Sequence, residues 1–323
     1  MKSPREAHSR CRFQSRLRDS RALRRGMSEK VIIICNPGAG SVEDRPSIRA
    51  QLEQYAGAQI RFTEGEGDGV RFAREAVAQG CEIVIAAGGD GTLNEIVNGI
   101  AAAADRVRIG LVPLGTGNDF AKMLDLPKST EECIEVLKAG KVRSIDMVRV
   151  TSDAVRYFVN VSAGGFSGTV SEKLTPEIKQ NWGPLAYLRS AAEALPELRA
   201  YRTEVTLDDA TTIALDLYNV VIANGRFVAG GTQIAPEASI DDGLLDVILV
   251  PKNPAIDLAL VAAQMAVGKH LQSDGVIFRC AAKVVVKSEP GMSFNVDGEL
   301  IGNEPAVFEV MPRALQFLVG TAV

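Results

Sequence analysis

The feature that most constrains the fold is a regular alternation of apolar runs with helical segments, which begins at Lys30. The apolar runs are VIIIC, QIRFT, EIVIAA and VRIGLVPL, and segments with helical periodicity such as RPSIRAQLEQYA and GVRFAREAVAQG separate them. Repeated pairs of strand and helix favour a parallel sheet that helices cover. The sequence therefore predicts an α/β domain over residues 27–150.

The pattern of apolar and polar residues changes after about residue 150. Alternating runs such as TEVTLDD, LYNVVIANG, LLDVILV and AKVVVK are typical of antiparallel strands with one buried face. Two helical segments, at 183–198 and 255–267, interrupt this half. We expect residues 151–323 to form a second, mostly antiparallel, sandwich-like β domain, whose last strand returns to the first domain.

Three strands of the first domain run into glycine-rich loops: NPGAG at 36–40, GGDG at 88–91 and GTGND at 115–119. Ligands of open parallel sheets bind outside the carboxyl ends of the strands, where bare backbone N–H groups and helix N-termini hold anionic oxygens. The loops therefore predict one shared phosphate site, to which the side chains of Asn36, Thr92, Thr116 and Asn118 add hydrogen bonds.

In the middle loop, Thr92 is expected to begin a helix whose buried face is Leu93, Ile96, Val97 and Ile100. Thr92 and Glu95 stand three residues apart, as in a capping box. A plainer interpretation is that the glycines only permit a tight turn, which the Asp90 side chain solvates.

A carboxylate beside phosphates is repulsive unless a cation lies between them, and Mg²⁺ bridges carboxylates to substrate phosphates. Asp90, Asp119 and Asp146 are the acids available for this ion. The alternative for Asp146 is a solvated residue at the start of a strand.

The familiar nucleotide motifs do not occur: the sequence has no G-x-x-x-x-G-K-[ST], no kinase HRD or DFG set, and no G-x-G-x-x-G after its first apolar run. His270, in VGKHLQS, is expected to be a helix cap or a surface residue and not a catalyst. Acid–base chemistry then falls to carboxylates.

Charge is distributed unevenly along the chain. The first 26 residues carry a net charge of +7, which leaves −11 for the rest of a chain whose formal charge is −4. This basic leader is either an import signal or membrane tether, or a disordered extension that precedes a folded unit starting at Met27. The acidic body gives no reason to expect a nucleic-acid partner, and five cysteines without C-x-x-C spacing fit a reducing cytoplasm.

Taken together, the motifs resemble the diacylglycerol-kinase-type lipid kinases of bacteria, which are related to sphingosine kinases and more distantly to NAD kinases and phosphofructokinases. GGDGT alone is shared with the distant relatives, whereas PLGTGNDFAK, APEASIDDGLLDV and VDGEL are similar to the lipid kinases specifically. The matching pieces run in family order from about residue 31 to residue 300.

The resemblance implies a fold of the NAD kinase and diacylglycerol kinase type, with ATP between an α/β domain and a β-sandwich-like domain. It implies nucleotide contacts from the matching positions, which are Asn36, Pro37, Gly38, Ala39, Gly40, Thr63, Gly89, Gly91, Thr92, Thr116 and Asn118. It also implies that Asp90 organises the catalytic Mg²⁺. A second, structural Mg²⁺ would be held by Asp242 and the main-chain oxygens of Ser239 and Leu244.

Glu299 occupies the position of the general base in the bacterial kinases, but sphingosine kinases assign that role to the aspartate equivalent to Asp90. By spacing alone, Glu299 is an ordinary strand residue after an Asp297-Gly298 hairpin turn. The first loop lacks the lysine that some relatives carry after it, which leaves Arg45, Arg49 and Lys122 as alternative cations for the triphosphate.

The favoured function is an ATP-dependent, Mg²⁺-dependent kinase that phosphorylates a hydroxyl of diacylglycerol or a related membrane lipid. Such an enzyme is expected to be cytoplasmic and peripheral at the inner membrane surface, with a homodimer as a further expectation. The alternatives are a soluble kinase of the NAD kinase type and a non-catalytic lipid-binding regulator. Trp182 and Tyr187 are either core residues or membrane-facing ones.

Overall fold

The protein is described by a computed structural model, which covers residues 29–173, 193, 198–252, 270–273, 275–302 and 305–320. The basic leader, Trp182, Tyr187 and the two helical segments predicted for the second half, apart from residues 193 and 198, lie outside the described residues.

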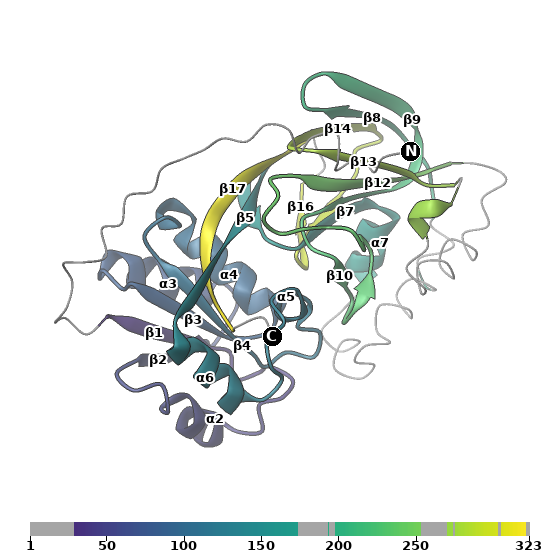
Figure 1. Cartoon of the computed structure of the whole chain (residues 1–323). Helices are drawn as coiled ribbons and strands as arrows, with labels where there is room; N and C mark the ends of the chain where they lie inside the picture. Colours follow the sequence, from purple (N-terminus) through teal and green to yellow (C-terminus); the bar gives the residue numbers. More distant parts are fainter. Residues whose placement is uncertain are drawn as a thin grey trace.

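The first half is the predicted α/β unit (Figure 1). Its parallel strands are β1 (Val31–Cys35), β2 (Gln59–Phe62), β3 (Ile83–Gly88) and β4 (Arg108–Pro113). Its helices are α2 (Arg45–Leu52), α3 (Asp68–Ala78), α4 (Asp90–Ile100), α5 (Asp119–Met123) and α6 (Thr130–Ala139), and a 3-10 turn (Ala101–Ala103) follows α4.

The strand order of this sheet is β2-β1-β3-β4, with every neighbouring pair parallel. The chain moves outward from β1 to β2 and then crosses back to β3 on the other side of β1. The order therefore reverses between β1 and β3, and at such a switch point two loops diverge and leave a crevice.

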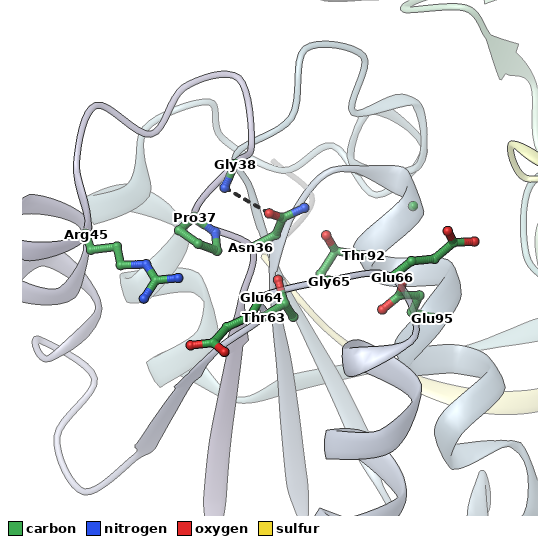
Figure 2. Close-up of a pocket in the computed structure, with 11 residues that line it drawn as sticks. Asn36, Pro37, Gly38, Arg45, Thr63, Glu64, Gly65, Glu66, Thr92 and Glu95 are labelled. Atoms are coloured by element: carbon green, nitrogen blue, oxygen red, sulfur yellow. Dashed lines mark hydrogen bonds between the residues drawn. The ribbon is translucent and has the colours of Figure 1, made fainter. Parts of the chain in front are cut away.

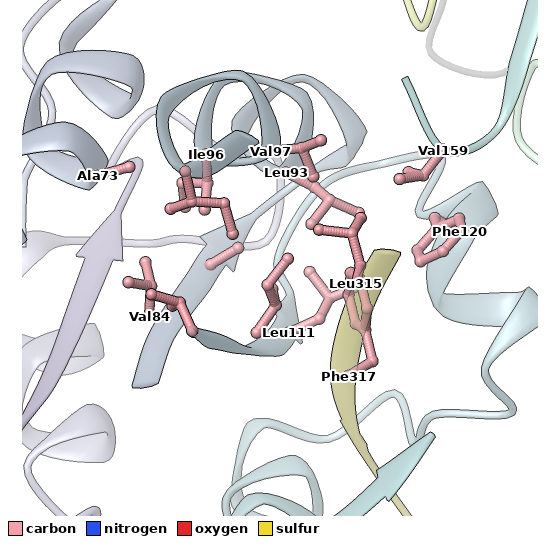
Figure 3. Close-up of a cluster of buried hydrophobic side chains, with 14 of the residues drawn as sticks. Ala73, Val84, Leu93, Ile96, Val97, Leu111, Phe120, Val159, Leu315 and Phe317 are labelled. Atoms are coloured by element: carbon pink, nitrogen blue, oxygen red, sulfur yellow. The ribbon is translucent and has the colours of Figure 1, made fainter. Parts of the chain in front are cut away.

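Both faces of the sheet are buried because β1 and β3 are apolar at every position. Ile32, Ile34 and Val84 pack with α3 and α4 on one face, whereas Ile33 and Ile85 pack with α2 and α6 on the other. Figure 3 shows the first of these clusters, with Leu93, Ile96 and Val97 of α4 directed toward the sheet. The predicted buried face of this helix is confirmed.

The second half is mostly antiparallel, as predicted. Its elements are β5 (Lys141–Thr151), β6 (Val155–Phe158), β7 (Val161–Gly165), α7 (Phe166–Lys173), β8 (Tyr201–Leu207), β9 (Thr211–Ala223), β10 (Phe227–Val228), β11 (Thr232–Gln233), β12 (Leu245–Pro251), a 3-10 turn (His270–Gln272), β13 (Ile277–Ala281), β14 (Lys283–Glu289), β15 (Phe294–Val296), β16 (Glu299–Ile301) and β17 (Ala306–Val319). A core that includes Phe158, Phe294 and Phe308 fills this half.

Two long strands join the halves (Figure 1). β17 pairs antiparallel with β5 along most of its length, and near its end it pairs parallel with β4 through Gln316 and Phe317. The register of this ribbon shifts between Met311 and Leu315. Continuous backbone pairing therefore joins the two halves of the chain.

Three expectations are corrected. Helix α4 begins at Asp90 with Gly89 as its N-cap, so Thr92 lies inside the first turn and forms no capping box with Glu95. His270 is 1 % exposed and its Nε2 lies 2.7 Å from the Ile234 carbonyl oxygen, so it is not a surface residue. Asp146 is completely buried on β5 and is not a solvated strand-start residue.

No helix among the described residues has both the length and the apolar character that crossing a bilayer requires.

Candidate active site

A pocket of about 460 Å³ lies at the switch point between β1 and β3. This volume is in the range of about 300–1,000 Å³ that small-molecule sites occupy. Figure 2 shows that its walls come from the loops after β1 and β2 and from the start of α4, with Arg45 of α2 at one side. The lining residues are Asn36, Pro37, Gly38, Arg45, Thr63, Glu64, Gly65, Glu66, Gly91, Thr92 and Glu95.

The N-terminus of α4 opens toward this pocket and has no side-chain cap. The carboxylate of Asp90, the first residue of the helix, turns away and accepts the N–H groups of Asp119 and Phe120, each at 3.0 Å. The first-turn amides at Gly91 and Thr92 are therefore left for a ligand. Such uncapped amides, at the positive end of the helix dipole, are an anion-binding arrangement.

The three glycine-rich loops meet, as the sequence predicts. A Cβ on Gly40 would lie 2.6 Å from Thr116 Oγ1, and a Cβ on Gly115 would lie 2.5 Å from Gly89 Cα. Gly115 is required because the backbones of two loops touch there, whereas at Gly40 the close neighbour is the Thr116 side chain. Asn118 holds its own loop together, since its side chain bonds both the N–H and the carbonyl of Gly115.

The predicted nucleotide contacts therefore fall into two groups. Asn36, Pro37, Gly38, Thr63, Gly91 and Thr92 line the pocket. The others do not line it: Ala39, Gly40 and Gly89 lie close to lining residues in the chain, whereas Thr116 and Asn118 lie in the loop at 115–119, which packs against Gly40 and Gly89.

Glu95 has a role that the sequence pattern hid. Its carboxylate accepts the N–H groups of Gly67 at 3.0 Å and Gly69 at 2.7 Å, so it caps helix α3 instead of its own helix. Gly69 is needed here because a Cβ would lie 2.4 Å from Glu95 Oε2. This contact ties the 64–66 wall of the pocket to α4.

Among the alternative cations, Arg45 lines the pocket, and no ion pair links it to another described residue. Arg49 lies 3.7 Å from Glu53 and Lys122 lies 3.2 Å from Asp119, so both have anionic partners. The Arg45 and Arg49 guanidinium groups lie 5.6 and 5.1 Å from the centre of the Phe62 ring.

A second carboxylate reaches the same region from the other half of the chain. Asp297, in the turn between β15 and β16, accepts the N–H groups of Val159 at 3.1 Å and Val161 at 2.9 Å. Asn94, one turn after Asp90 on α4, donates to it at 3.4 Å. Burial raises the pKa of Asp297 to about 6, the hydrogen bonds oppose this rise, and the charge of Asp90 reinforces it.

Asp90 and Asp119 form an acidic pair beside the loops. Burial raises the pKa of Asp90, its two backbone hydrogen bonds oppose the rise, and the nearby charge of Asp119 adds to it. Asp119 also accepts the N–H of Gly230 at 2.9 Å, which brings a loop of the second half to this pair.

Asp146 does not join this pair by any hydrogen bond between described residues. Its carboxylate accepts the N–H groups of Gly243 and Arg313, each at 2.7 Å, and burial raises its pKa. The structure thus places it beside the loop at 239–244 and the irregular part of β17. In that loop Asp242 accepts the N–H of Leu244 at 3.1 Å, and Ser239 donates to Asp241 at 2.9 Å.

Glu299 is the first residue of β16 and pairs with Val296, which confirms the predicted hairpin; its side chain is outside the described part of the chain. Sequence reasoning missed Asp297 because a DG pair before a strand is explained by the turn alone. The sequence feature that could have identified it is the VDGEL motif, in which Asp297 stands two residues before Glu299.

Comparison with known proteins agrees with this geometry. The family described as the diacylglycerol kinase catalytic domain matches residues 30–150, and the YegS C-terminal NAD kinase beta sandwich-like domain matches residues 160–319. A diacylglycerol kinase of Staphylococcus haemolyticus is 33 % identical over 294 residues, with 88 % of this chain and 86 % of the relative covered. A diacylglycerol kinase of Staphylococcus saprophyticus is also 33 % identical, over 87 % of this chain and 92 % of the relative.

Solved structures show the same fold. A diacylglycerol kinase from Bacillus anthracis has a TM-score of 0.71 at 21 % identity, with 91 % of this chain and 98 % of that chain covered. An NAD kinase from Archaeoglobus fulgidus, solved with ATP, has a TM-score of 0.51 at 14 % identity, over 90 % of this chain and 94 % of that chain. The identity over nearly the whole chain and the two matching domains show that this chain belongs to the diacylglycerol kinase family.

Proposed function

We propose that this member of the family transfers the γ-phosphate of ATP to a hydroxyl of diacylglycerol or a related membrane lipid, at the cytoplasmic face of a membrane and with Mg²⁺. The observation that carries the proposal is that helix α4, whose N-terminus lines an anion-binding pocket, also holds two carboxylates from opposite halves of the chain: its own Asp90, and Asp297 through Asn94. Phosphoryl transfer needs such positioning, charge neutralisation and a proton acceptor.

The nucleotide fits the pocket at the switch point. Backbone amides at Gly91 and Thr92 would face its phosphates, and Arg45 supplies the positive charge at the rim. Because Arg49 and Lys122 already have anionic partners, Arg45 is the cation that we assign to the triphosphate.

The residues present also fit a magnesium ion. Each oxygen of Asp90 accepts one N–H and keeps a lone pair, and Asp119 lies close enough to raise the pKa of Asp90. Mg²⁺, when bound, would neutralise the phosphate charge that develops during transfer. Asp90 and Asp119 would hold it through one or two carboxylates, with water and substrate oxygens completing the shell.

Asp297 is our candidate for the proton acceptor, beside Glu299 and Asp90. A base must be deprotonated at the working pH yet retain affinity for a proton, and a pKa of about 6 meets both conditions. Asp297 would take the proton of the lipid hydroxyl as that oxygen forms its bond to the γ-phosphorus, while the bond from phosphorus to the bridging oxygen of ADP breaks.

The loop at 239–244 remains our proposal for a second, structural Mg²⁺ at Ser239, Asp242 and Leu244. Asp146, which accepts the N–H of Gly243, would brace that loop. We also propose that the chain divides at about residue 150, and that a homodimer is the assembled form.

Transfer of labelled phosphate from ATP to a panel of acceptors tests the proposed function. The panel contains diacylglycerol, phosphatidylglycerol, sphingosine and undecaprenol in mixed micelles, and NAD in solution, each with Mg²⁺ or with EDTA. Labelled diacylglycerol or another labelled lipid, formed only with Mg²⁺, is the expected result. Labelled NAD with no labelled lipid would identify a soluble kinase of the NAD kinase type, and no product with any acceptor would favour a non-catalytic regulator.

A further inference from the structure

The carboxylate of Asp297 lies in an arch of backbone N–H groups at 159–161, between β6 and β7. It accepts the N–H groups of Val159 at 3.1 Å, Asn160 at 3.4 Å and Val161 at 2.9 Å. Consecutive N–H groups rarely point the same way without support, because each peptide plane turns freely about its φ and ψ angles. The arch therefore needs partners on its far side.

Asn224, the residue that follows β9, supplies those partners. Its side-chain Nδ2 donates to the Val159 carbonyl at 2.6 Å, and its backbone N–H donates to the Asn160 carbonyl at 2.8 Å. The N–H of Gly225 also donates to the Asn160 carbonyl, at 2.8 Å. Asn224 is completely buried, so these bonds form away from water.

The two carbonyls belong to the same peptide groups as two of the N–H groups that Asp297 accepts. The Val159 carbonyl shares a plane with the Asn160 N–H, and the Asn160 carbonyl shares one with the Val161 N–H. In a trans peptide, C=O and N–H point in opposite directions, so a donor that fixes the carbonyl from behind aims the N–H forward. Asn224 thus fixes the direction of two peptide dipoles that point at Asp297.

A contact from the opposite side secures the turn that carries Asn224. Asn160, which is 8 % exposed, donates its Nδ2 to the Phe227 carbonyl at 2.8 Å. The Oδ1 atoms of Asn160 and Asn224 are buried, and neither has a hydrogen-bond partner among the described residues. Each such oxygen lowers stability and so offsets part of the gain from the bond that its Nδ2 donates.

We propose that Asn224 is a positioning residue. It acts through the peptide groups of 159–161 to hold the Asp297 carboxylate in place for proton transfer. The proposal rests on the proposed function, in which Asp297 takes the proton of the lipid hydroxyl. Asn224 itself touches neither the carboxylate nor any reacting atom in this scheme.

The direction of the effect follows from the groups that face Asp297. Helix α4 contributes the charge of Asp90 and the amide of Asn94, whereas 159–161 contributes N–H donors. Donors to a carboxylate favour its charged form. Removing the Asn224 side chain frees the peptide plane of Val159 and Asn160, whereas the next plane keeps the backbone donors of Asn224 and Gly225. One N–H donor to Asp297 is weakened, so the proton affinity of this carboxylate rises and its titration midpoint moves upward by up to about one pH unit.

The test compares Asn224→Ala with Asn219→Ala. Asn219 lies on β9, the strand that ends just before Asn224, and its Oδ1 accepts the N–H of Ser167 at 3.0 Å, so the control also removes one bond between a side chain and the backbone. The titration of Asp297 is followed by carboxyl-carbon NMR in protein labelled at aspartate, with Asp297→Asn identifying the signal. An upward shift in Asn224→Ala and an unchanged midpoint in Asn219→Ala are expected. Equal midpoints in all three proteins would overturn the proposal.

Activity provides the second measurement. In Asn224→Ala, the acid limb of kcat against pH should move upward with the NMR midpoint, and KM for ATP should stay within twofold of the wild-type value. A decrease in kcat by the same factor at every pH would indicate a merely structural role and count against the proposal. If Asn224→Ala does not fold, Asn160→Ala replaces it, because that change releases the same turn through Phe227; its midpoint should also rise.

The NMR titration needs no turnover, so it separates the two ideas. A wild-type protein that phosphorylates no lipid would refute the proposed function, whatever the midpoints are. An active wild-type protein with unshifted midpoints in the variants would refute only the role of Asn224.

Discussion

The carboxylate of Asp90 accepts the backbone N–H of Asp119 at 3.0 Å, which fixes the acid of one strand-end loop to the backbone of the next. Its other oxygen accepts the N–H of Phe120 at the same distance. Asp90 thereby orders the two loops and still offers a lone pair on each oxygen to a ligand. The same group is both a brace and a candidate ligand of magnesium.

Replacing Asp90 with asparagine should separate these roles. The amide retains one acceptor but directs an NH₂ group at a backbone N–H, and it removes the charge that would hold Mg²⁺. We expect kcat for lipid phosphorylation to fall by about 10²- to 10³-fold, the size of loss typical of a charge-stabilising group. The measurement is labelled phosphate transfer, with the melting temperature as a check on folding.

Asp105→Asn is the matched control, because this acid is 79 % exposed and contacts only Arg106 in the described structure. It should retain wild-type activity. Asp297→Asn and Glu299→Gln belong in the same series, since three acids are candidates for the base. Full activity in Asp90→Asn would remove this residue from the chemistry, and full activity in Asp297→Asn would return the base to Glu299 or Asp90.

The raised pKa of Asp297 predicts how stability depends on pH. The pKa is about 6 in the folded protein, whereas the ordinary value of an aspartate, expected in the unfolded chain, is 3.8. The folded state therefore binds the proton more tightly than the unfolded state. The stabilisation is fully present below about pH 4 and is lost as the pH rises through about 6. The shift corresponds to about 3 kcal/mol of unfolding free energy.

Urea unfolding at pH 4, 5, 6 and 7 measures this effect as the difference between the wild-type protein and Asp297→Asn. Taking the difference matters because burial also raises the pKa values of Asp90 and Asp146, which act in the same direction. The wild-type protein should lose stability relative to the variant between pH 4 and pH 7. A difference that stays constant with pH would show that Asp297 does not titrate in this range.

Local patterns in the sequence predicted much of this site. Alternating apolar and helical segments fix the βα units, and parallel strands necessarily bring their carboxyl ends to one edge. The loops at 36–40, 88–91 and 115–119 therefore meet as expected. The pocket at the β1/β3 switch point, which needs the strand order, could not be read from the same patterns.

Contacts between distant segments were not predictable in this way. Glu95 matches a capping box by spacing, yet it caps α3 because that helix N-terminus lies beside α4 in the folded protein. Asp146 and Asp297 look like solvated residues of a strand start and a turn, but the N–H groups that they accept lie about 97 or more residues away. Local periodicity carries no information about such partners.

The position of Arg45 predicts a selective effect on nucleotide binding. Its guanidinium lines the pocket and stacks near Phe62, without an anionic partner among the described residues. Arg45→Ala should raise KM for ATP about tenfold and change kcat less than twofold, because it removes a contact made equally in the ground state and the transition state. Steady-state kinetics with ATP varied at a saturating lipid concentration measures both constants.

Arg49→Ala is the matched control, since Arg49 stacks on the same ring but pairs with Glu53. Its KM for ATP should remain within twofold of the wild-type value. If both variants behave alike, the ring contact and not the position in the pocket governs binding. If neither variant changes KM, another cation balances the triphosphate.

The contact between Gly89 and Gly115 predicts that the loops tolerate no side chain there. In Gly115→Ala the new methyl group would lie 2.5 Å from Gly89 Cα and 2.8 Å from Asn118 Oδ1, and the backbone of one loop must move. We expect a loss of about 1–3 kcal/mol in unfolding free energy, which is typical of an overpacked site. Activity should fall as well, because Gly89 directly precedes Asp90 and a shift of this loop would move that carboxylate.

Gly65→Ala is the control for stability, since a Cβ there meets no atom within 4 Å. Urea unfolding of the two variants measures the difference; equal stability would mean that the loops can separate without cost, and that the three-loop site is looser than its contacts indicate.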